Sequence, residues 1–245
     1  MATLPRPSVG GTRSRKAGRG RGRLLDTPYG RTVDRALLLD VGVVLLKSAW
    51  EIANDFERLN NLPPRTVPGR GPFDGGTDQL WERHLAGELT EREYWLGNAE
   101  VAVANGAPLN GHPHLMRAMF QHPGIQTARP EAVALLQQAQ AADIHTAIFS
   151  NELMDFQGRA WTEAQPWFQL FEIVVDATES GLRKPDPRAY QLVIDEVGLP
   201  PSRMVFVDDN PTYVEAGVRA GMRTVLLDVL RPAAAFDAAA RLLGL

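Results

Sequence analysis

The run Met204-Val205-Phe206-Val207-Asp208-Asp209 joins four apolar residues directly to two adjacent carboxylates. A second run of the same form, Leu37-Leu38-Leu39-Asp40, lies near the start of the chain. Short apolar runs of this kind are typical of buried parallel strands, whose carboxyl ends gather at one edge of a sheet. We therefore expect Asp40, Asp208 and Asp209 to meet at that edge.

Three carboxylates at one edge of a sheet repel each other unless a cation lies between them. Oxygen ligands favour Mg²⁺ over Zn²⁺. The chain contains no cysteine, which excludes disulfides, thiolate metal sites and a cysteine nucleophile. The acidic residues therefore predict a magnesium site.

Strand-like and helix-like stretches alternate along most of the chain. The strand-like runs lie at residues 37–44, 143–150, 172–175, 204–207 and 224–227. Apolar side chains recur at helical spacing over 130–141 and 187–197. Asp186 before Pro187 is typical of a helix cap followed by proline in the first helical position. The alternation predicts an α/β fold with a doubly wound, Rossmann-like parallel sheet.

The segment of residues 48–121 breaks this alternation. It carries no strong strand pattern, and its helix-like patches lie at 50–60, 78–86, 90–104 and 113–120. Because the segment follows the first strand directly, it is expected to lie over the carboxyl end of that strand. We predict a helical cap domain at 48–121, inserted into a core domain made of 34–47 and 122–245.

The composition suits a globular protein. The 245 residues, 44% of them apolar, suffice for one large core or for a core domain with a smaller insert. No apolar stretch approaches the ~18 residues of a membrane span, and the opening segment lacks the apolar core of a signal peptide. The lack of cysteine fits a reducing compartment. We expect a cytoplasmic protein without a membrane partner.

Charge is unevenly distributed along the chain. Residues 1–35 carry nine Arg or Lys side chains against two Asp, whereas the whole chain has a net charge of −3. The acidic remainder is a poor binder of nucleic acid. Residues 10–23 are glycine-rich and nearly free of large apolar side chains, so we expect residues 1–33 to form a disordered basic tail. The tail is interpreted either as a solvated extension or as a tether to an anionic surface.

Four motifs, in this order along the chain, resemble those of haloacid dehalogenase-like (HAD) hydrolases. They are LLLDVGVV at 37–44, FSN at 149–151, KPDP at 184–187 and VDDN at 207–210. The chain is most similar to the branch with a small helical cap between the first two motifs, which includes sugar-phosphate phosphatases and the amino-terminal phosphatase domain of soluble epoxide hydrolases. One motif alone is a weak signal, but the ordered set is specific.

The resemblance implies a hydrolase of phosphate monoesters that uses Mg²⁺ and acts on a small phosphorylated metabolite. Asp40 is the implied nucleophile, forming an aspartyl-phosphate that water then hydrolyses. Mg²⁺ is expected to bind Asp40, Asp209 and the backbone carbonyl of Gly42. Asp208 is expected to coordinate through water or to orient a ligand.

The other two motifs supply the implied phosphate site. Ser150 is expected to hydrogen-bond a phosphoryl oxygen through its hydroxyl, helped by the Asn151 amide. Lys184 is expected to keep Asp40 ionised and to stabilise the transition state. Taken singly, each residue also has a structural interpretation: Ser150 and Asn151 as a turn pair, and Lys184 as a solvated surface lysine.

Gly42 departs from the family pattern, because phosphatases of this family usually carry a second aspartate there as acid and base. Loss of a positioned acid typically costs about 10²- to 10⁴-fold in rate. Two alternatives to the phosphatase therefore stay open. One is a non-catalytic binder of phosphate or another ligand with the same fold. The other is a 2-haloacid dehalogenase, which is disfavoured because it would leave Asp208 and Asp209 as unneeded buried charges.

The sequence does not name the substrate, since the residues that select it are expected on the cap. The five tryptophans are interpreted as packing residues rather than as stacking partners of a substrate; they are Trp50, Trp81, Trp95, Trp161 and Trp167. A helical cap also offers a surface for a homodimer.

Overall fold

Five strands form one parallel sheet in the order β3-β2-β1-β4-β5 in the computed structural model, which describes residues 33–74, 77–107 and 112–245. The strands are β1 (Ala36–Leu39), β2 (His145–Ser150), β3 (Ile173–Asp176), β4 (Met204–Asp208) and β5 (Arg223–Leu226). In the central strand, Leu39 pairs with Ile148 of β2 and with Val207 of β4. This register brings Asp40 beside the carboxyl ends of both neighbours, as the sequence predicts.

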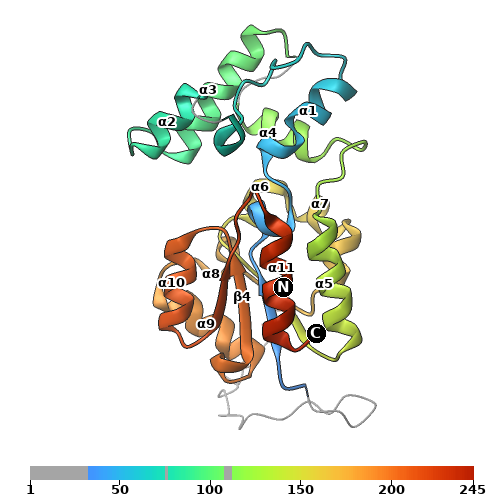
Figure 1. The fold of residues 1–245 in the computed structure, drawn as a ribbon, viewed down its shortest axis with the longest axis vertical. Helices are drawn as coiled ribbons and strands as arrows, with labels where there is room; N and C mark the ends of the chain where they lie inside the picture. The colour runs from blue at the N-terminus through green and yellow to red at the C-terminus, as the bar shows by residue number, and fades with distance from the viewer. Residues whose placement is uncertain (1–32, 75–76, 108–111) are drawn as a thin grey trace, which may run out of the picture.

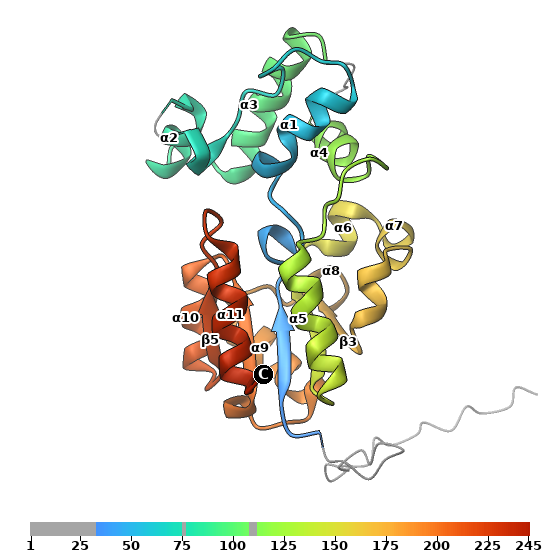
Figure 2. The same ribbon diagram turned by 45° about the vertical axis from the view of Figure 1, so that its right-hand side comes forward.

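Helices cover both faces of the sheet. Helices α5 (Pro130–Ala141) and α11 (Pro232–Leu243) lie side by side on one face, as Figure 2 shows, and α9 (Pro187–Val197) and α10 (Pro211–Arg219) cover the other. The side chains of β1 alternate accordingly: Leu37 and Leu39 pack with α5 and α11, whereas Ala36 and Leu38 pack with α9 and α10. The predicted doubly wound α/β fold is confirmed.

Shorter elements complete the layer around the sheet. They are η1 (Val41–Leu45), α6 (Leu153–Gln157), α7 (Arg159–Glu163), η3 (Pro166–Leu170), α8 (Ala177–Ser180) and η4 (Pro201–Arg203). Of these, η1 and α6 follow directly on β1 and β2 at the carboxyl edge of the sheet. Both elements are therefore placed where a site of this fold is expected.

A group of helices lies beyond that edge, at the top of Figure 1. It comprises α1 (Ala49–Leu59), η2 (Gly71–Asp74), α2 (Gln79–Leu85), α3 (Glu91–Ala104) and α4 (His112–Phe120). A capping box in which Ser48 and Glu51 exchange hydrogen bonds begins α1. The four helix-like patches of the sequence are thus confirmed as helices, and the division of the chain into domains stays a prediction.

Aromatic rings form the centre of this helical group. The Trp50 ring stacks on Trp95 with centroids 5.8 Å apart, and its Nε1 donates to the Tyr94 hydroxyl at 3.0 Å. The Tyr94 hydroxyl in turn donates to Asp78 Oδ2 at 2.7 Å. Gly71, with φ of +47°, lies so close to Trp50 that a Cβ there would be 2.5 Å from the ring. Packing therefore fixes the Trp50 ring from several sides.

The first strand is shorter than predicted. The apolar run at 37–44 was expected to be one strand, but β1 ends at Leu39. The chain then turns sharply through η1, where Val43 has φ of 59° and the Leu45 amide donates to the Asp40 carbonyl at 3.3 Å. Hydrophobicity did not reveal this turn because Val41 and Val44 are buried in it as fully as strand residues would be.

Two further expectations concern the chain beyond the sheet. The predicted basic tail, residues 1–33, lies outside the described residues except for position 33. Within the described ranges, none of the helices combines the length and the apolar character needed to cross a bilayer.

Candidate functional site

Lys184 lies at the centre of the polar site, although only 3% of its surface is exposed. Its Nζ donates to Asp40 Oδ1 at 2.7 Å and to Asp208 Oδ2 at 2.6 Å. Burial lowers the pKa of Lys184, but the carboxylates of Asp40 and Asp208 outweigh that effect and hold the pKa above its usual value. The lysine is therefore charged and bridges the two carboxylates.

Aromatic rings surround the same ammonium group. Nζ lies 5.3 Å from the ring centroids of Phe149 and Phe206 and 5.2 Å from that of Tyr213. Such cation–π contacts stabilise a desolvated cation. Because the rings come from β2, β4 and α10, the fold itself fixes the position of the charge.

Asp208 ends β4 with only 1% of its surface exposed. Its second oxygen, Oδ1, accepts a hydrogen bond from the Asn210 amide at 2.9 Å. Burial, helped by the charge of Asp40, raises the pKa of Asp208 to about 6, against the opposing effect of Lys184. Both oxygens of Asp208 are engaged, so this carboxylate holds Lys184 in place, and its predicted part in metal binding stays a prediction.

Ser150 ends β2 and is almost fully buried. Its Oγ accepts hydrogen bonds from the backbone amides of Glu152 at 3.3 Å and Leu153 at 3.2 Å. These two bonds use the acceptor side of the hydroxyl, which leaves its proton available to a ligand oxygen. The arrangement suits the phosphate contact expected from the sequence.

Asn151 fixes the backbone of Lys184. Its Oδ1 accepts from the Lys184 amide at 2.7 Å, and its Nδ2 donates to the Lys184 carbonyl at 3.1 Å. The same Nδ2 lies 3.4 Å from the Tyr213 hydroxyl. The side chain thus acts as a positioning group for Lys184, and a contact of its amide with phosphate stays a prediction.

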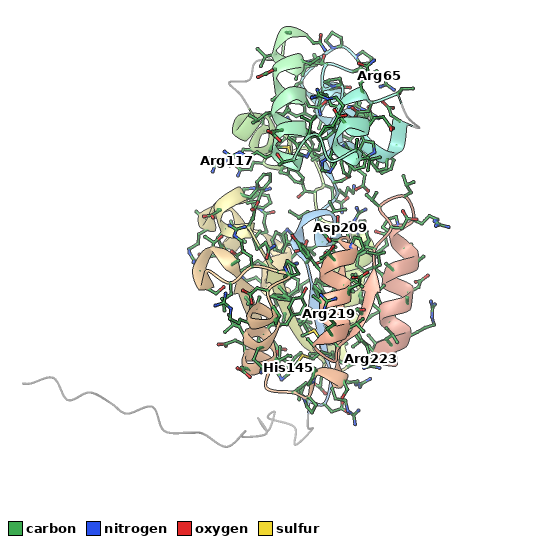
Figure 3. All side chains as sticks on the ribbon, turned by 90° about the vertical axis from the view of Figure 1, so that its left-hand side faces the viewer. Arg65, Arg117, His145, Asp209, Arg219 and Arg223 are labelled. Carbon is green, nitrogen blue, oxygen red and sulfur yellow. The ribbon has the colours of Figure 1, made fainter. Side chains whose placement is uncertain are left out.

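A cavity of about 340 Å³ opens at this edge of the sheet and extends to the helical group. Besides Gly42, the residues with polar side chains that border it are Asp40, Lys47, Ser48, Ser150, Asn151, Glu152, Gln157, Asp209, Asn210 and Tyr213. Figure 3 shows Asp209 at the upper end of the α/β layer, below the helical group. In the same view Arg117 of α4 extends toward the layer below, where its Nε donates to the Phe156 carbonyl of α6 at 3.5 Å.

The donors in the cavity suit Mg²⁺ better than a softer metal. Asp40, Asp209 and the backbone of Gly42 all border the cavity, and Mg²⁺ usually binds one or two carboxylates while keeping several waters. Across the described residues, however, no group of three or more Asp, Glu or His side chains is arranged to hold a metal ion. Asp40 and Asp208 are both bound to the Lys184 ammonium, and the part of the three carboxylates in metal binding stays a prediction.

Gly42 leaves open space beside Asp40. A Cβ at Gly42 would have a single close neighbour, Asp40 Oδ2, at 3.7 Å, an ordinary van der Waals distance. The backbone there has φ of −63°, which any residue can adopt. No steric reason in the structure therefore requires glycine at this position.

The sequence did not indicate the apolar half of the cavity. Its large helical side chains are Trp50, Trp95, Met116, Phe120, Leu153 and Phe156, and Val41, Val43, Leu46 and Ala49 border the cavity as well. Trp50 and Trp95 pack on each other as predicted, but they also border the cavity, so their interpretation as packing residues alone was incomplete. Met116 and Phe120 carry no signal beyond helical periodicity, whereas α6 could have been suspected because it follows the FSN motif.

Comparison with known proteins gives the class. The sequence profile of the haloacid dehalogenase-like hydrolases matches residues 31–221. The chain belongs to this family and is a hydrolase by that membership. The family motifs contribute the strands at the centre of the sheet, the lysine that bridges two aspartates, and polar residues that border the cavity.

Curated relatives include both phosphatases and dehalogenases. The chain is 28% identical to acyl-CoA dehydrogenase family member 10 of Mus musculus over 93% of its length, but spans only 21% of that protein. It is 30% identical to a phosphoserine phosphatase of Thermus thermophilus, with 63% of this chain and 65% of that one aligned. It is 25% identical to (S)-2-haloacid dehalogenase 1 of a Pseudomonas species, covering 78% of this chain and 80% of that one.

Solved structures share the fold. The putative HAD-hydrolase YfnB of Bacillus subtilis, solved with bound magnesium, superposes with a TM-score of 0.59 over 87% of this chain and all of its own. The identity of 17% shows a common fold alone. Reaction and substrate must therefore be argued from the site.

Proposed function

We propose that this protein is a Mg²⁺-dependent phosphatase that hydrolyses phosphate monoesters of small soluble metabolites through an aspartyl-phosphate at Asp40. The observation that carries the proposal is the bridge from Lys184 to Asp40, 2.7 Å long, at the polar end of a cavity that also presents the Ser150 hydroxyl. A fixed cation and a hydroxyl donor beside a carboxylate suit an incoming phosphoryl group.

The residues divide the chemistry among them. The Lys184 ammonium holds Oδ1 of Asp40, which leaves Oδ2 to attack phosphorus while the bond from phosphorus to the alcohol oxygen breaks. The alcohol takes its proton from water, since Gly42 supplies no acid. A water molecule then attacks the phosphorus, which releases inorganic phosphate and restores the Asp40 carboxylate.

Mg²⁺, when bound, would neutralise charge on the phosphoryl oxygens. Asp40, Asp209 and the Gly42 carbonyl are the groups that would hold it, since all three residues border the cavity. The Ser150 hydroxyl would donate to one phosphoryl oxygen, and Lys184 would stabilise the negative charge of the transition state.

The same proposal includes a cap domain at residues 48–121 over a core of 34–47 and 122–245. The two connections between these segments lie side by side, because the Lys47 amide donates to the Thr127 carbonyl at 2.7 Å and Leu46 bridges to Ala128. Paired connections of this kind suit a hinge. Cytoplasmic location, the lack of a nucleic-acid partner and a homodimer stay predictions.

The test is phosphate release from a broad panel of monoesters with Mg²⁺. We expect turnover by the wild type and its loss in Asp40→Asn, whereas Asp237→Asn, an exposed aspartate of α11, should keep the wild-type rate. Absence of turnover on the whole panel, or full activity of Asp40→Asn, would refute the proposal.

Dehalogenation of a 2-halo acid is the second candidate. It is favoured by the Lys184 bridge, which already neutralises charge at Asp208 without a metal, and by the dehalogenase among the relatives. Asp40 would attack the carbon that carries the halogen, the halide would leave, and water would hydrolyse the resulting ester. Halide release from 2-chloropropionate in the presence of EDTA, without phosphatase activity, would establish this reaction.

A non-catalytic binder remains the third candidate, since Gly42 lacks the usual acid. Saturable phosphate binding to a protein that releases no product from either panel would support it. Efficient turnover of any ester excludes it.

A further inference from the structure

The cavity has two chemically distinct halves. Its sheet side carries Asp40, Ser150 and Asp209, where the phosphoryl group of the proposed reaction would lie. The other half is built from the large apolar side chains of α1, α3, α4 and α6. Pairs of rings make this part rigid: Trp50 stacks on Trp95, and Phe120 meets Phe156 edge to face with centroids 6.2 Å apart. A leaving group would therefore enter an apolar, preformed space.

Gln157 is a polar residue beside these apolar side chains. It ends α6, one helical turn after Leu153, and only 4% of its surface is exposed. Its side-chain Oε1 is buried and accepts no hydrogen bond from the described residues. Its backbone carbonyl, in contrast, accepts from Gln121 Nε2 of the neighbouring segment at 3.0 Å, which fixes this end of α6.

A buried carboxamide oxygen without a partner is unusual in a folded protein, because its desolvation is not offset by a hydrogen bond. Gln157 borders the cavity, so rotation of its carboxamide toward the cavity would let a ligand there supply the missing partner. A hydroxyl group matches either end of the carboxamide, since it both donates and accepts.

The same wall disfavours a polyhydroxylated leaving group. A sugar would bring several hydroxyls into this part of the cavity, where the side chains of Trp50, Trp95 and Phe156 offer them no hydrogen-bond partner. Hydroxyls that face these rings would lose water without gaining partners. A volume of about 340 Å³ lies at the small end of ligand cavities, so a single ring beside the phosphoryl group fills it.

We infer that the substrate, on the phosphatase assignment proposed above, is a phosphate monoester of a compact and largely apolar alcohol that carries one further hydroxyl for Gln157. Gln157 is thus a specificity residue, and the rings of Trp50, Trp95 and Phe156 hold the apolar body of the leaving group. A polyhydroxylated sugar phosphate is a poor substrate.

The test compares four kinds of phosphate ester whose alcohols are small but differ in the number of hydroxyl groups. They are 2-phenylethyl phosphate, its 2-, 3- and 4-hydroxyphenyl analogues, glucose 6-phosphate and glycerol phosphate. We expect kcat/KM for 2-phenylethyl phosphate to exceed that for glucose 6-phosphate by about 100-fold or more. One hydroxyphenyl isomer should be preferred over 2-phenylethyl phosphate by at least about tenfold.

Gln157→Leu separates the two parts of the inference. The variant should lose the preference for the hydroxyphenyl isomer, so that the ratio of its kcat/KM values for that isomer and for 2-phenylethyl phosphate falls to about one. Because a buried carboxamide with an unpaired oxygen is replaced by an apolar group of similar volume, the melting temperature of the ligand-free variant should rise. Gln138→Leu, an exposed position on α5, is the matched control and should alter neither property.

Phe156→Ala tests the apolar wall. It should lower kcat/KM for 2-phenylethyl phosphate by about 10- to 200-fold and leave that for methyl phosphate nearly unchanged. Leu85→Ala, an exposed position in α2, serves as its control.

The possible negative results distinguish a wrong substrate class from a wrong function. Efficient hydrolysis of glucose 6-phosphate or glycerol phosphate without hydrolysis of the phenylethyl esters overturns the inference and leaves the phosphatase assignment standing. If the wild type shows no preference among the phenylethyl esters, or if Gln157→Leu keeps that preference, the role of Gln157 is overturned. Absence of phosphate release from every ester defeats the proposed function itself.

Discussion

Arg129 forms a bidentate ion pair with Glu51 across the two connections between the sheet and the helical group, with Nη1 to Oε1 at 2.7 Å and Nη2 to Oε2 at 2.6 Å. The arginine is 2% exposed, and its Nε donates to the Val43 carbonyl at 2.8 Å. Glu51 also accepts from the amide and hydroxyl of Ser48 at the start of α1. One guanidinium therefore ties the turn after β1 to the first helix of the helical group.

Arg129→Met should destabilise the protein strongly. The substitution leaves the Glu51 carboxylate without its cation in a mostly buried place, and breaking such a pair costs about 3 kcal/mol or more. Urea unfolding measures the loss. Arg58→Met is the matched control, because its pair with Asp55 is exposed and worth at most about 1 kcal/mol. Equal effects of the two substitutions would contradict the role given to Arg129.

Lys184→Met should lower both the stability of the protein and its activity. A second substitution should restore the stability but not the activity. Without the ammonium, Asp40 and Asp208 face each other with no cation, at a cost of about 3–5 kcal/mol in the free energy of unfolding. Lys184→Met combined with Asp208→Asn removes one of the two charges and should recover most of that loss. Phosphate release should stay reduced by about 10²-fold or more in both variants.

Urea unfolding and phosphate release, measured on the same preparations, separate the two effects. A double variant as unstable as Lys184→Met would mean that charge is not the cause. Retained turnover in either variant would remove Lys184 from the reaction.

The meeting of Asp40 and Asp208 could be predicted from the sequence because parallel strands share one polarity. Two apolar runs that end in carboxylates place those carboxylates at one edge whatever the loops do. The hydrogen bond from the Asp40 amide to the Val207 carbonyl, 3.0 Å long, is a direct result of that register.

The partner of Asp208 could not be predicted in the same way. Lys184 lies in a loop, and its ammonium reaches the carboxylates because Asn151 holds its backbone and three rings surround its charge. Such placement depends on contacts between segments far apart in sequence. The apolar wall of the cavity was missed for the same reason, since Met116 and Phe156 come from helices whose periodicity does not tell a core face from a cavity.

Removal of divalent metal should abolish turnover if the phosphatase proposal holds. Dialysis against EDTA is expected to stop phosphate release, and added Mg²⁺ to restore it, because Asp40, Glu152 and Asp209 border the cavity and a divalent cation offsets the negative charge that a phosphate adds there. Asp209→Asn should raise the Mg²⁺ concentration for half-maximal rate by about tenfold or more. Asp237→Asn should leave it unchanged. Full activity after EDTA treatment would instead favour metal-free chemistry.

Gly42→Asp should accelerate phosphate release without harming the fold. The new Cβ would meet Asp40 Oδ2 at 3.7 Å, an ordinary contact, and the backbone already has a φ that aspartate adopts, so neither the Cβ nor the backbone opposes the substitution. A positioned acid can protonate the departing alkoxide, which is worth about 10²-fold or more in rate when proton transfer limits turnover. Gly42→Asn is the control, since it has the same size and no proton to give. If only Gly42→Asp raises the rate of phosphate release, and most for esters of poorly acidic alcohols, proton supply is the limiting step. Equal rates for Gly42→Asp, Gly42→Asn and wild type would show that another step limits the reaction.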